Sequence, residues 1–378
     1  MAASVRLDGD TMAKETQPKV ISHEAFMKGM ATKYGAKSIA LLSNHNHAEI
    51  IHWSSTGVYS LDDAMSWALP GGRVVEYFGA ESSGKTTAMM AAMIENARNG
   101  GLNFCADAEG TFDRDRYAQM GGDPDKVTLF YPSTLENFYD WAKDLIAWAK
   151  TQEVPTTSVI LIAVDTLPML IPAEVLKSTD EDRTVGAAAR VNSQHLPTID
   201  KALGQNTCLL LLNQVRDKIG AMAWTQEGNI DTPGGRIVKH IASLRVLFNK
   251  QGQIDNGKSA DAREIIGMKT GAKVVKSKVG PPLRKVDYRI MFDERGVDNA
   301  DACLQAFVKR KLIPAAVKGV YKIGETTFNR NTWPQFVKTH PKWVAKALEA
   351  TFELYHETID VSRYKDDQAN GSDGEAAE

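Results

Sequence analysis

Residues 79–86 match the phosphate-binding pattern G-x-x-x-x-G-K-[ST], and no other feature of the chain constrains its fold as strongly. An apolar run at 73–78 precedes the motif and a helix-forming run at 87–98 follows it. In a strand–loop–helix of this kind, successive backbone N–H groups converge on the helix N-terminus, and phosphate fits there. An accidental Gly/Ser-rich turn is the alternative, but it does not explain the flanking elements. The chain is therefore expected to bind a nucleoside triphosphate.

Lys85 and Thr86 carry the chemistry of this motif. The Lys85 ammonium is expected to neutralise the β- and γ-phosphates, and the Thr86 hydroxyl is expected to hold Mg²⁺. ATP and Mg²⁺ are the expected cofactors. The nucleotide-binding residues predicted within the loop are Gly79, Glu81, Ser82, Ser83, Gly84, Lys85, Thr86 and Thr87.

Apolar runs alternate with helical patterns through the middle of the chain. Strands are predicted at 74–78, 102–106, 127–130, 159–164, 208–212 and 244–248. The run at 159–164 is apolar throughout, which is typical of a central parallel strand covered on both faces. Between 135 and 148, aromatic and aliphatic residues recur at helical spacing, which favours core packing over a base-stacking platform. The pattern predicts an α/β fold with a mostly parallel central sheet and helices on both faces.

Changes in composition divide the chain into five regions. The first region is a disordered polar start (1–19). The second (20–54) contains a helix, a break at Gly35 and a strand, and its helix can pack on a neighbouring subunit. The α/β core (55–295), a small α+β domain with a helical stretch at 333–354 (296–358) and an acidic disordered tail (359–378) follow. From Asp360 onward the tail carries a net charge of −4, so the remaining chain carries +2. Because that charge is small, any binding site for a polyanion has to be local.

The composition indicates a cytoplasmic protein. No apolar run approaches the roughly 20 residues that a membrane helix needs, and the first residues do not resemble a secretion signal. Cys105, Cys208 and Cys303 are isolated and odd in number. Since the first two lie in apolar runs, buried free thiols are expected rather than a disulfide or a metal site.

Polar side chains follow three of the predicted strands. Asp165 ends the run at 159–164, where a carboxylate can bind Mg²⁺, although an acid at a strand end can also cap a helix. Glu109 follows the strand at 102–106 and can polarise an attacking water, or it can be a plain loop acid. Gln214 follows the strand at 208–212, where its amide can sense a γ-phosphate. The carboxyl ends of parallel strands share one edge, so all three side chains are expected at the nucleotide.

Two loops and one basic cluster are candidates for a second ligand. The loop at 215–232 is long, and loops of that length are usually functional; the loop at 177–185 is acidic. The basic residues are Lys269, Lys273, Lys276, Lys278, Arg284, Lys285 and Arg289, and composition alone does not separate a binding surface from a solvated face. Three histidines, His45, His47 and His52, have only Glu49 nearby, which favours ordinary surface histidines over a metal site.

Several blocks of the chain, in one order, resemble the RecA recombinases of bacteria and phages. They include the P-loop, with Ala80 where proline is usual, the segment 107–109, the segment 213–220, Gly234 and Gly235 through 243–245, and the segment 274–278. The likeness runs from about 22 to 352. It implies a P-loop ATPase that forms a helical filament on single-stranded DNA, pairs it with homologous duplex and exchanges strands.

The resemblance also implies roles for individual residues. Glu109 would be the catalytic base, Asp165 a Mg²⁺ ligand together with Thr86, and Gln214 the γ-phosphate sensor. Asp113 and Tyr117 would contact adenine. Lys276 and Lys278 would reach the phosphates bound by the neighbouring subunit, and the N-terminal helix would make the polymerisation contact.

The two DNA-binding segments implied by the resemblance are 177–185, with the helix after it, and 216–235. The DNA-contacting residues would be Val185, Gly186, Arg190, Ser193, Arg216, Lys218, Gly220, Trp224, Gly234, Gly235 and Arg236. Single-strand-binding and loader proteins are further expected partners, and no membrane is expected. The chain departs from the family pattern at Pro197, Asp217 and His240.

Two other functions share some of these features. A ring-shaped helicase uses the same nucleotide fold, but the helix ahead of the P-loop and the segment at 213–214 favour the recombinase. A DNA-coating protein without catalysis would not need both Glu109 and Asp165.

Overall fold

The computed structural model describes residues 23–35, 39, 49–177, 186–217, 230–257, 262–314, 317–330 and 332–352. It has two compact units, Met1–Glu49 and Ile50–Glu378. In the first unit, helix α1 (His23–Tyr34) is followed by Gly35, whose φ of +93° lies in the left-handed region that glycine adopts easily. The predicted helix and its break are confirmed. The strand predicted after Gly35 lies almost wholly outside the described residues.

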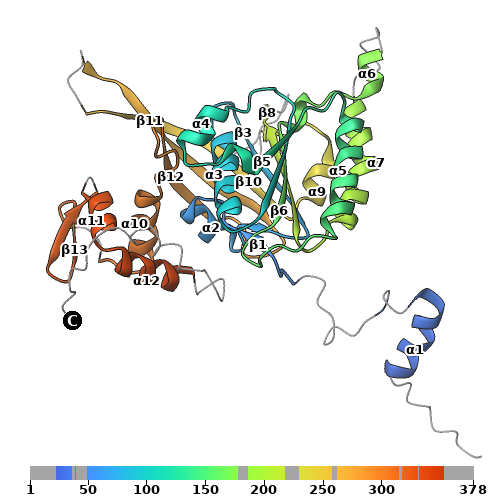
Figure 1. Cartoon of the computed structure of the whole chain (residues 1–378), viewed down its shortest axis with the longest axis horizontal. Coiled ribbons are helices and arrows are strands. Elements are labelled where there is room, and N and C mark those ends of the chain that lie inside the picture. Colours follow the sequence, from blue (N-terminus) through green and yellow to red (C-terminus); the bar gives the residue numbers. More distant parts are fainter. Residues whose placement is uncertain are drawn as a thin grey trace, which may run out of the picture. The chain divides into compact units, whose positions relative to one another are not determined.

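An eight-stranded sheet forms the centre of the second unit, in the order β12-β11-β10-β3-β7-β6-β4-β5 (Figure 1). The strands are β3 (Arg73–Gly79), β4 (Leu102–Asp107), β5 (Val127–Phe130), β6 (Ile160–Asp165), β7 (Thr207–Gln214), β10 (Leu244–Asp255), β11 (Ile265–Ser277) and β12 (Lys285–Met291). From β10 to β5 every pairing is parallel. β11 and β12 add an antiparallel edge. All six predicted strands are present, and the mostly parallel sheet is confirmed.

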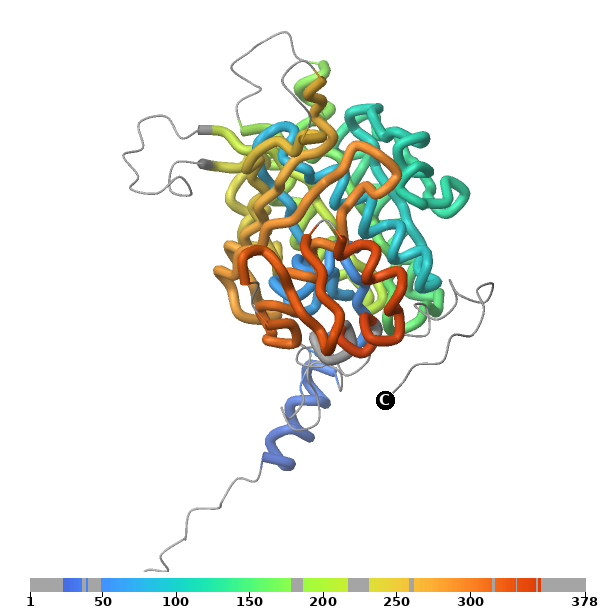
Figure 2. The backbone as a smooth tube through the Cα atoms, turned by 90° about the vertical axis from the view of Figure 1, so that its left-hand side faces the viewer, coloured from blue at the N-terminus to red at the C-terminus, as the bar shows by residue number. Residues whose placement is uncertain are grey.

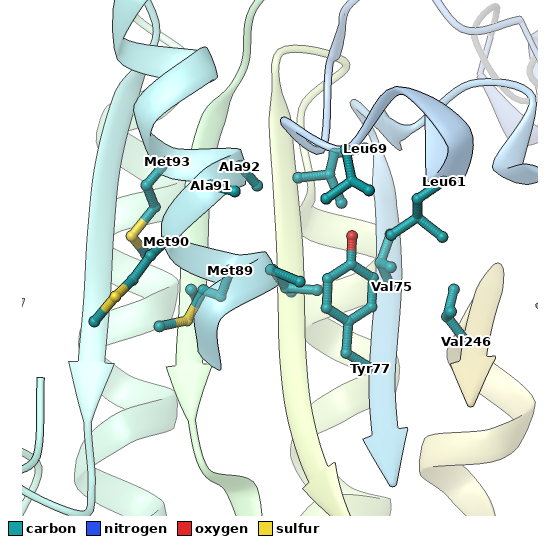
Figure 3. Packing of buried hydrophobic residues seen from close by; sticks show 14 of the residues in the cluster. Leu61, Leu69, Val75, Tyr77, Met89, Met90, Ala91, Ala92, Met93 and Val246 are labelled. Carbon is teal, nitrogen blue, oxygen red and sulfur yellow. The ribbon is translucent and has the colours of Figure 1, made fainter. Parts of the chain in front are cut away.

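Helices cover both faces of this sheet because neighbouring strand residues point to opposite faces. Val75 and Tyr77 of β3 belong to a cluster with α2 (Tyr59–Met65) and α3 (Lys85–Arg98), whereas Val74 belongs to a cluster with α5 (Leu135–Ala149) and α7 (Ala187–Ala202). Figure 3 shows Met89 of α3 on the side of the helix that is nearer Tyr77, whereas Met90 and Met93 point away from Val75 and Tyr77. The aromatic residues of α5 serve the core, as predicted: Phe138 is buried, and Trp141 stacks on Phe130 with ring centroids 4.7 Å apart.

Shorter elements connect these layers. They are β1 (Trp53–Ser54), β2 (Leu69–Pro70), α4 (Arg114–Gln119), the 3₁₀ turns Pro124–Lys126 and Leu167–Met169, α6 (Ala173–Lys177), β8 (Arg216–Asp217), β9 (Ile230–Asp231) and α9 (Arg236–Ile241). All three cysteines are buried free thiols, as expected. Within the described ranges, no helix has the length and apolar character that crossing a membrane requires.

The C-terminal elements pack around a cluster of their own. They are α10 (Asn299–Lys309), β13 (Val320–Ile323), β14 (Thr326–Asn329), α11 (Trp333–Thr339) and α12 (Pro341–Phe352), and Figure 2 shows them gathered in orange and red. Trp333 is fully buried at the centre of the cluster. The helical stretch predicted at 333–354 is two helices, because Pro341 has no N–H to continue α11 and instead begins α12.

Asp63 of α2 links the core to these C-terminal elements. Its buried carboxylate forms ion pairs with Arg310 and, at 3.2 Å, with Lys309 at the end of α10. Nearby, the Asn299 side chain donates to the Gly57 carbonyl at 2.7 Å. A buried carboxylate needs such partners, because removing it from water is otherwise unfavourable.

Replacing Asp63 with alanine is therefore expected to lower the free energy of unfolding by about 1.5–3 kcal/mol, the range for hydrogen bonds to charged groups. Denaturant unfolding gives the loss, and limited proteolysis reports whether the C-terminal elements separate from the core. Asp140→Ala is the matched control: its ion pair with Lys143 is exposed, so a loss below about 1 kcal/mol is expected. Equal losses in the two variants would show that Asp63 does not hold the junction.

Candidate nucleotide-binding site

The loop between β3 and α3 has the backbone geometry that phosphate binding requires. Gly79 ends β3 against β10, where a Cβ would lie 2.3 Å from the Phe248 carbonyl oxygen. Gly84 has a φ of +96°, and a Cβ there would lie 2.6 Å from a methyl group of Ile290. No side chain fits at either position. Both glycines are therefore needed for the chain to turn from β3 into α3.

Lys85 folds back over this loop. Its Nζ donates to the carbonyl oxygens of Gly79 at 3.0 Å and Ala80 at 2.8 Å. Burial lowers the pKa of Lys85, and the nearby carboxylates of Asp165 and Glu109 oppose that effect. Phosphate oxygens can replace the two carbonyls as acceptors and would supply the negative charge that this ammonium favours.

Thr86 and Asp165 meet in the way a magnesium site requires. The Thr86 hydroxyl donates to Asp165 Oδ2 at 2.8 Å, while Oδ1 is buried with no hydrogen-bond partner in the described structure. Burial raises the pKa of Asp165 to about 6, and the charges of Glu109 and Asp107 act in the same direction. An unpaired carboxylate oxygen beside a hydroxyl is the oxygen-rich environment that Mg²⁺ prefers. These residues therefore fit the ion that the motif implies.

Glu109 lies next to Asp165 at the same sheet edge. Its backbone N–H donates to the Asp165 carbonyl at 3.3 Å, and its carboxylate accepts from the Thr166 hydroxyl at 2.8 Å. Glu109 is exposed, whereas the buried Asp107 carboxylate accepts the backbone N–H groups of Thr111 and Phe112. Asp107 thus supports the turn after β4, and Glu109 remains accessible for chemistry.

Strand register brings the remaining predicted side chain to the same edge. Gln214 lies directly opposite Gly79 in the parallel pairing of β7 with β3, and Asp107 lies opposite Asp165 in the pairing of β4 with β6. The strand ends that carry Lys85, Gln214, Asp165 and Glu109 are therefore neighbours.

A cavity of about 410 Å³ opens beside the P-loop. Its lining combines the loop and α3 with residues distant in sequence: Ser82, Ser83, Gly84, Lys85, Thr86, Thr87, Arg116, Lys250, Met268, Ile290 and Phe292. Sequence reasoning missed Arg116, Lys250 and Phe292. No motif marks these residues. Lys250 on β10 and Phe292 after β12 reach the cavity only because β10, β11 and β12 pack against the P-loop. The Phe292 side chain is 53% exposed, so its ring is available to a ligand.

Tyr117, which the resemblance implies as an adenine contact, does not line this cavity. Tyr117 is fully buried in the core and packs on Phe112 with ring centroids 5.6 Å apart. One helical position earlier, Arg116 lines the cavity and donates to the Met291 and Asp293 carbonyls. The turn of α4 therefore presents Arg116 to the site and Tyr117 to the core. Asp113 caps α4 by accepting the Arg116 N–H at 2.8 Å, and it does not line the cavity.

Lys276 lies on β11 and Lys278 follows that strand. Both side chains contact the C-terminal end of α9, and neither lines the cavity of its own chain. Lys276 Nζ donates to the Lys239 and His240 carbonyls, and Lys278 Nζ donates to the His240 carbonyl at 3.1 Å. Burial, together with the charges of Lys278 and Arg245, lowers the pKa of Lys276 to about 8. Cations are favourable at this end of a helix dipole.

The described residues of the two predicted DNA-binding segments flank two helices. Gly186 precedes α7, on which the Arg190 guanidinium pairs with Glu174 at 2.7 Å and the Ser193 hydroxyl donates to the Ala189 carbonyl. Arg216 lies on β8 opposite Asp231, and Gly234, Gly235 and Arg236 lead into α9. Four predicted contact residues, Val185, Lys218, Gly220 and Trp224, lie outside the described residues, as do His45 and His47. No group of three metal-binding side chains occurs in the part of the chain that the structure describes.

Comparison with known proteins shows the family of the chain. The family model described as the RecA N-terminal domain matches residues 21–298. Protein RecA of Paracoccus denitrificans is 30% identical over 353 residues, which cover 92% of this chain and 93% of that protein. Protein RecA of Ruegeria pomeroyi is 30% identical over 350 residues, 91% of this chain and 95% of that protein. Protein RecA of Chlamydia trachomatis is 32% identical over 292 residues, 77% of this chain and 78% of that protein.

Replacing Asp165 with asparagine is expected to stabilise the nucleotide-free protein. The pKa of Asp165 rises from 3.8 to about 6 on folding, and each pKa unit corresponds to about 1.4 kcal/mol. The ionised carboxylate thus destabilises the folded state by at most about 3 kcal/mol. That penalty is complete above pH 6 and disappears as the pH falls toward 4, because the folded state takes up the proton first.

Denaturant unfolding without nucleotide or Mg²⁺, at pH 7.5 and pH 4.5, measures this difference. The stability advantage of Asp165→Asn should be larger at pH 7.5. An advantage that does not change with pH would contradict the proposed cause.

Proposed function

The chain belongs to the RecA family of recombinases, and on that premise we propose that it is a DNA-dependent ATPase that assembles into a helical filament on single-stranded DNA and exchanges strands with homologous duplex. One observation carries the proposal: Lys85, Glu109, Asp165 and Gln214 come together at the carboxyl edge of one parallel sheet. Each has the chemical character that ATP hydrolysis needs at that place. No observation favours the ring-shaped helicase.

ATP would bind with its phosphates in the P-loop. The backbone N–H groups at the start of α3 and the Lys85 ammonium would face the phosphate oxygens, because both are positive and both lie at the cavity. Thr86 and Asp165 would hold Mg²⁺, which neutralises charge on the phosphates when it is bound. Ser83 Oγ is also buried without a partner in the described structure, which leaves a further donor for this site.

Glu109 would act as the general base. The Thr166 hydroxyl holds one carboxylate oxygen at 2.8 Å, so the other remains available to orient a water for attack on the γ-phosphate. Gln214, beside Gly79, would hydrogen-bond the γ-phosphate and lose that bond on hydrolysis. This difference between the ATP and ADP states would determine the affinity of the segment 216–235 for DNA.

Assembly would complete the site. α1 has no buried residues, and Phe26 and Tyr34 are exposed on it, so the helix presents apolar surface for a second copy of the chain. Lys276 and Lys278 would contact the phosphates bound by the neighbouring subunit. The DNA strand would contact basic residues such as Arg190, Arg216 and Arg236, and binding should weaken as salt increases. Such a filament would act in the cytoplasm, where single-strand-binding and loader proteins are candidate partners.

The wild-type protein is expected to hydrolyse ATP faster when single-stranded DNA is added. Lys85→Ala should abolish ATP-dependent DNA binding, because the phosphates lose their main cation. Glu109→Gln should bind ATP and DNA normally but hydrolyse at least about 100-fold more slowly. Glu153→Gln, an exposed position outside the cavity, is the matched control. If the rate of ATP hydrolysis by the wild-type protein does not change when single-stranded DNA is added, the recombinase proposal is wrong.

Phe292 is proposed to stack on the adenine base, since it is the exposed aromatic residue in the cavity lining. Phe292→Ala should weaken ATP binding about tenfold, within the range for base–aromatic stacking, as measured by titration with a fluorescent ATP analogue. Tyr117→Phe is the control. It removes a buried hydroxyl that has no hydrogen-bond partner in the described structure, so the affinity should not change. An affinity for ATP that is unchanged in Phe292→Ala would contradict the proposed stacking.

A further inference from the structure

Two buried asparagines hold consecutive backbone carbonyls where the second predicted DNA-binding segment ends. Asn213 Nδ2 donates to the Pro233 carbonyl at 3.1 Å, and Asn192 Nδ2 donates to the Gly234 carbonyl at 2.9 Å. Both side chains are almost completely buried. Asn213 ends β7 and Asn192 lies in the middle of α7, so two separate elements converge on one point of the chain.

Asn213 connects this point to the nucleotide site. The same Nδ2 donates to Glu76 Oε1 at 2.9 Å, and the Asn213 Oδ1 accepts the backbone N–H of Gln214 at 3.0 Å. Glu76 lies on β3, three positions before the first P-loop glycine, and forms a buried ion pair with Arg245. Asn213 therefore contacts the strand that carries the P-loop, the backbone of the proposed γ-phosphate sensor and the end of the DNA-binding segment.

Arg245 adds a second connection from this pair to the same stretch of chain. Its guanidinium lies 3.4 Å from the Thr232 hydroxyl and 4.4 Å from the centre of the Phe78 ring. The Asn213 amide and the Arg245 guanidinium thus contact residues 232–234 from the side of the nucleotide site, and both also bond to the Glu76 carboxylate. A shift of β3 or β7 relative to α9 would have to stretch or exchange these bonds.

Asn192 connects the same point to the first DNA-binding segment. Its Oδ1 accepts the Tyr139 hydroxyl at 2.6 Å, so both halves of the amide are used. A Cβ on Gly234 would lie 2.9 Å from Asn192 Nδ2, and one on Gly235 would lie 2.7 Å from Ala189 Cβ. The glycine pair therefore packs directly on α7. That helix begins at Ala187, immediately after the first predicted DNA-binding segment.

We propose that Asn192 and Asn213 are positioning residues that make 232–235 a shared anchor between α7, β7 and the P-loop strand β3, and that this anchor couples nucleotide binding to DNA binding. The proposal rests on the proposed function and adds a physical route to it. The apolar side chains of Leu167 and Val238 lie beside Gly234, and Asn192 is almost completely buried, so its amide is favourable there only while its hydrogen bonds are made. Breaking one of these hydrogen bonds therefore leaves a buried polar group unsatisfied, which opposes displacement of 232–235 from α7 and β7.

The test compares single-stranded DNA binding with a slowly hydrolysed ATP analogue and with ADP. In the double variant Tyr139→Phe/Asn192→Leu, both members of the α5–α7 hydrogen bond become apolar and the donor to Gly234 is lost. The ratio of the two dissociation constants should fall at least about fivefold from its wild-type value, the lower end of typical coupling between sites. The KM for ATP should remain unchanged while the DNA-stimulated kcat falls.

Tyr139→Phe alone is the comparison variant: it leaves Asn192 Oδ1 without its donor but keeps the amide donor on the Gly234 carbonyl, so the ratio should fall less than in the double variant. Thermal unfolding without DNA shows whether the double variant is folded; if it is not, Asn192→Ala replaces it in the same comparison. A folded variant that retains the wild-type ratio overturns the anchor alone. A wild-type protein whose DNA affinity is the same with ATP analogue and ADP overturns both the anchor and the proposed function.

Discussion

Parallel pairing of β3, β7, β6 and β4 is the constraint on which the rest of the structure depends. It forces the carboxyl ends of four strands to one edge, and the side chains that follow those strands then have to lie together. The strands are held by apolar packing on both faces, with Val74 and Val75 facing opposite clusters. Burial of that kind is strong and non-directional. It can therefore hold polar groups at the edge in positions that they would not adopt by themselves.

Several of those polar groups are poorly satisfied in the described structure. Asp165 keeps one buried oxygen without a partner, Ser83 has a buried hydroxyl in the same situation, and Lys85 is held against carbonyls that phosphate oxygens can replace. An unpaired buried polar atom destabilises the free protein, and the proposed binding of phosphate and Mg²⁺ would relieve that cost at Asp165 and Ser83. This is the expected trade between stability and function at a preorganised site.

A chain of polar contacts inside an otherwise apolar core leads away from this edge. It runs from Glu76 through Asn213 to Pro233, and from Gly234 through Asn192 to Tyr139. Buried polar networks are stable only when every member is satisfied, so they define positions more sharply than apolar packing does. The elements so joined are β3, which leads into the P-loop, β7, which carries the proposed γ-phosphate sensor, and α7 and residues 233–234, which border the proposed DNA-binding segments.

Local sequence pattern was sufficient to predict the nucleotide-binding loop and most of the central sheet of this protein. The P-loop, the alternation of strands and helices, and the acids after the strands at 102–106 and 159–164 are all readable because each depends on neighbours in the chain. Tertiary structure alone decided which face α4 turns inward, and thus that Arg116 rather than Tyr117 lines the cavity. It also decided that Phe292 joins a loop more than 200 positions earlier, and that Asn192 meets Gly234. Such contacts follow from helix phase and sheet order, which no short stretch of sequence specifies.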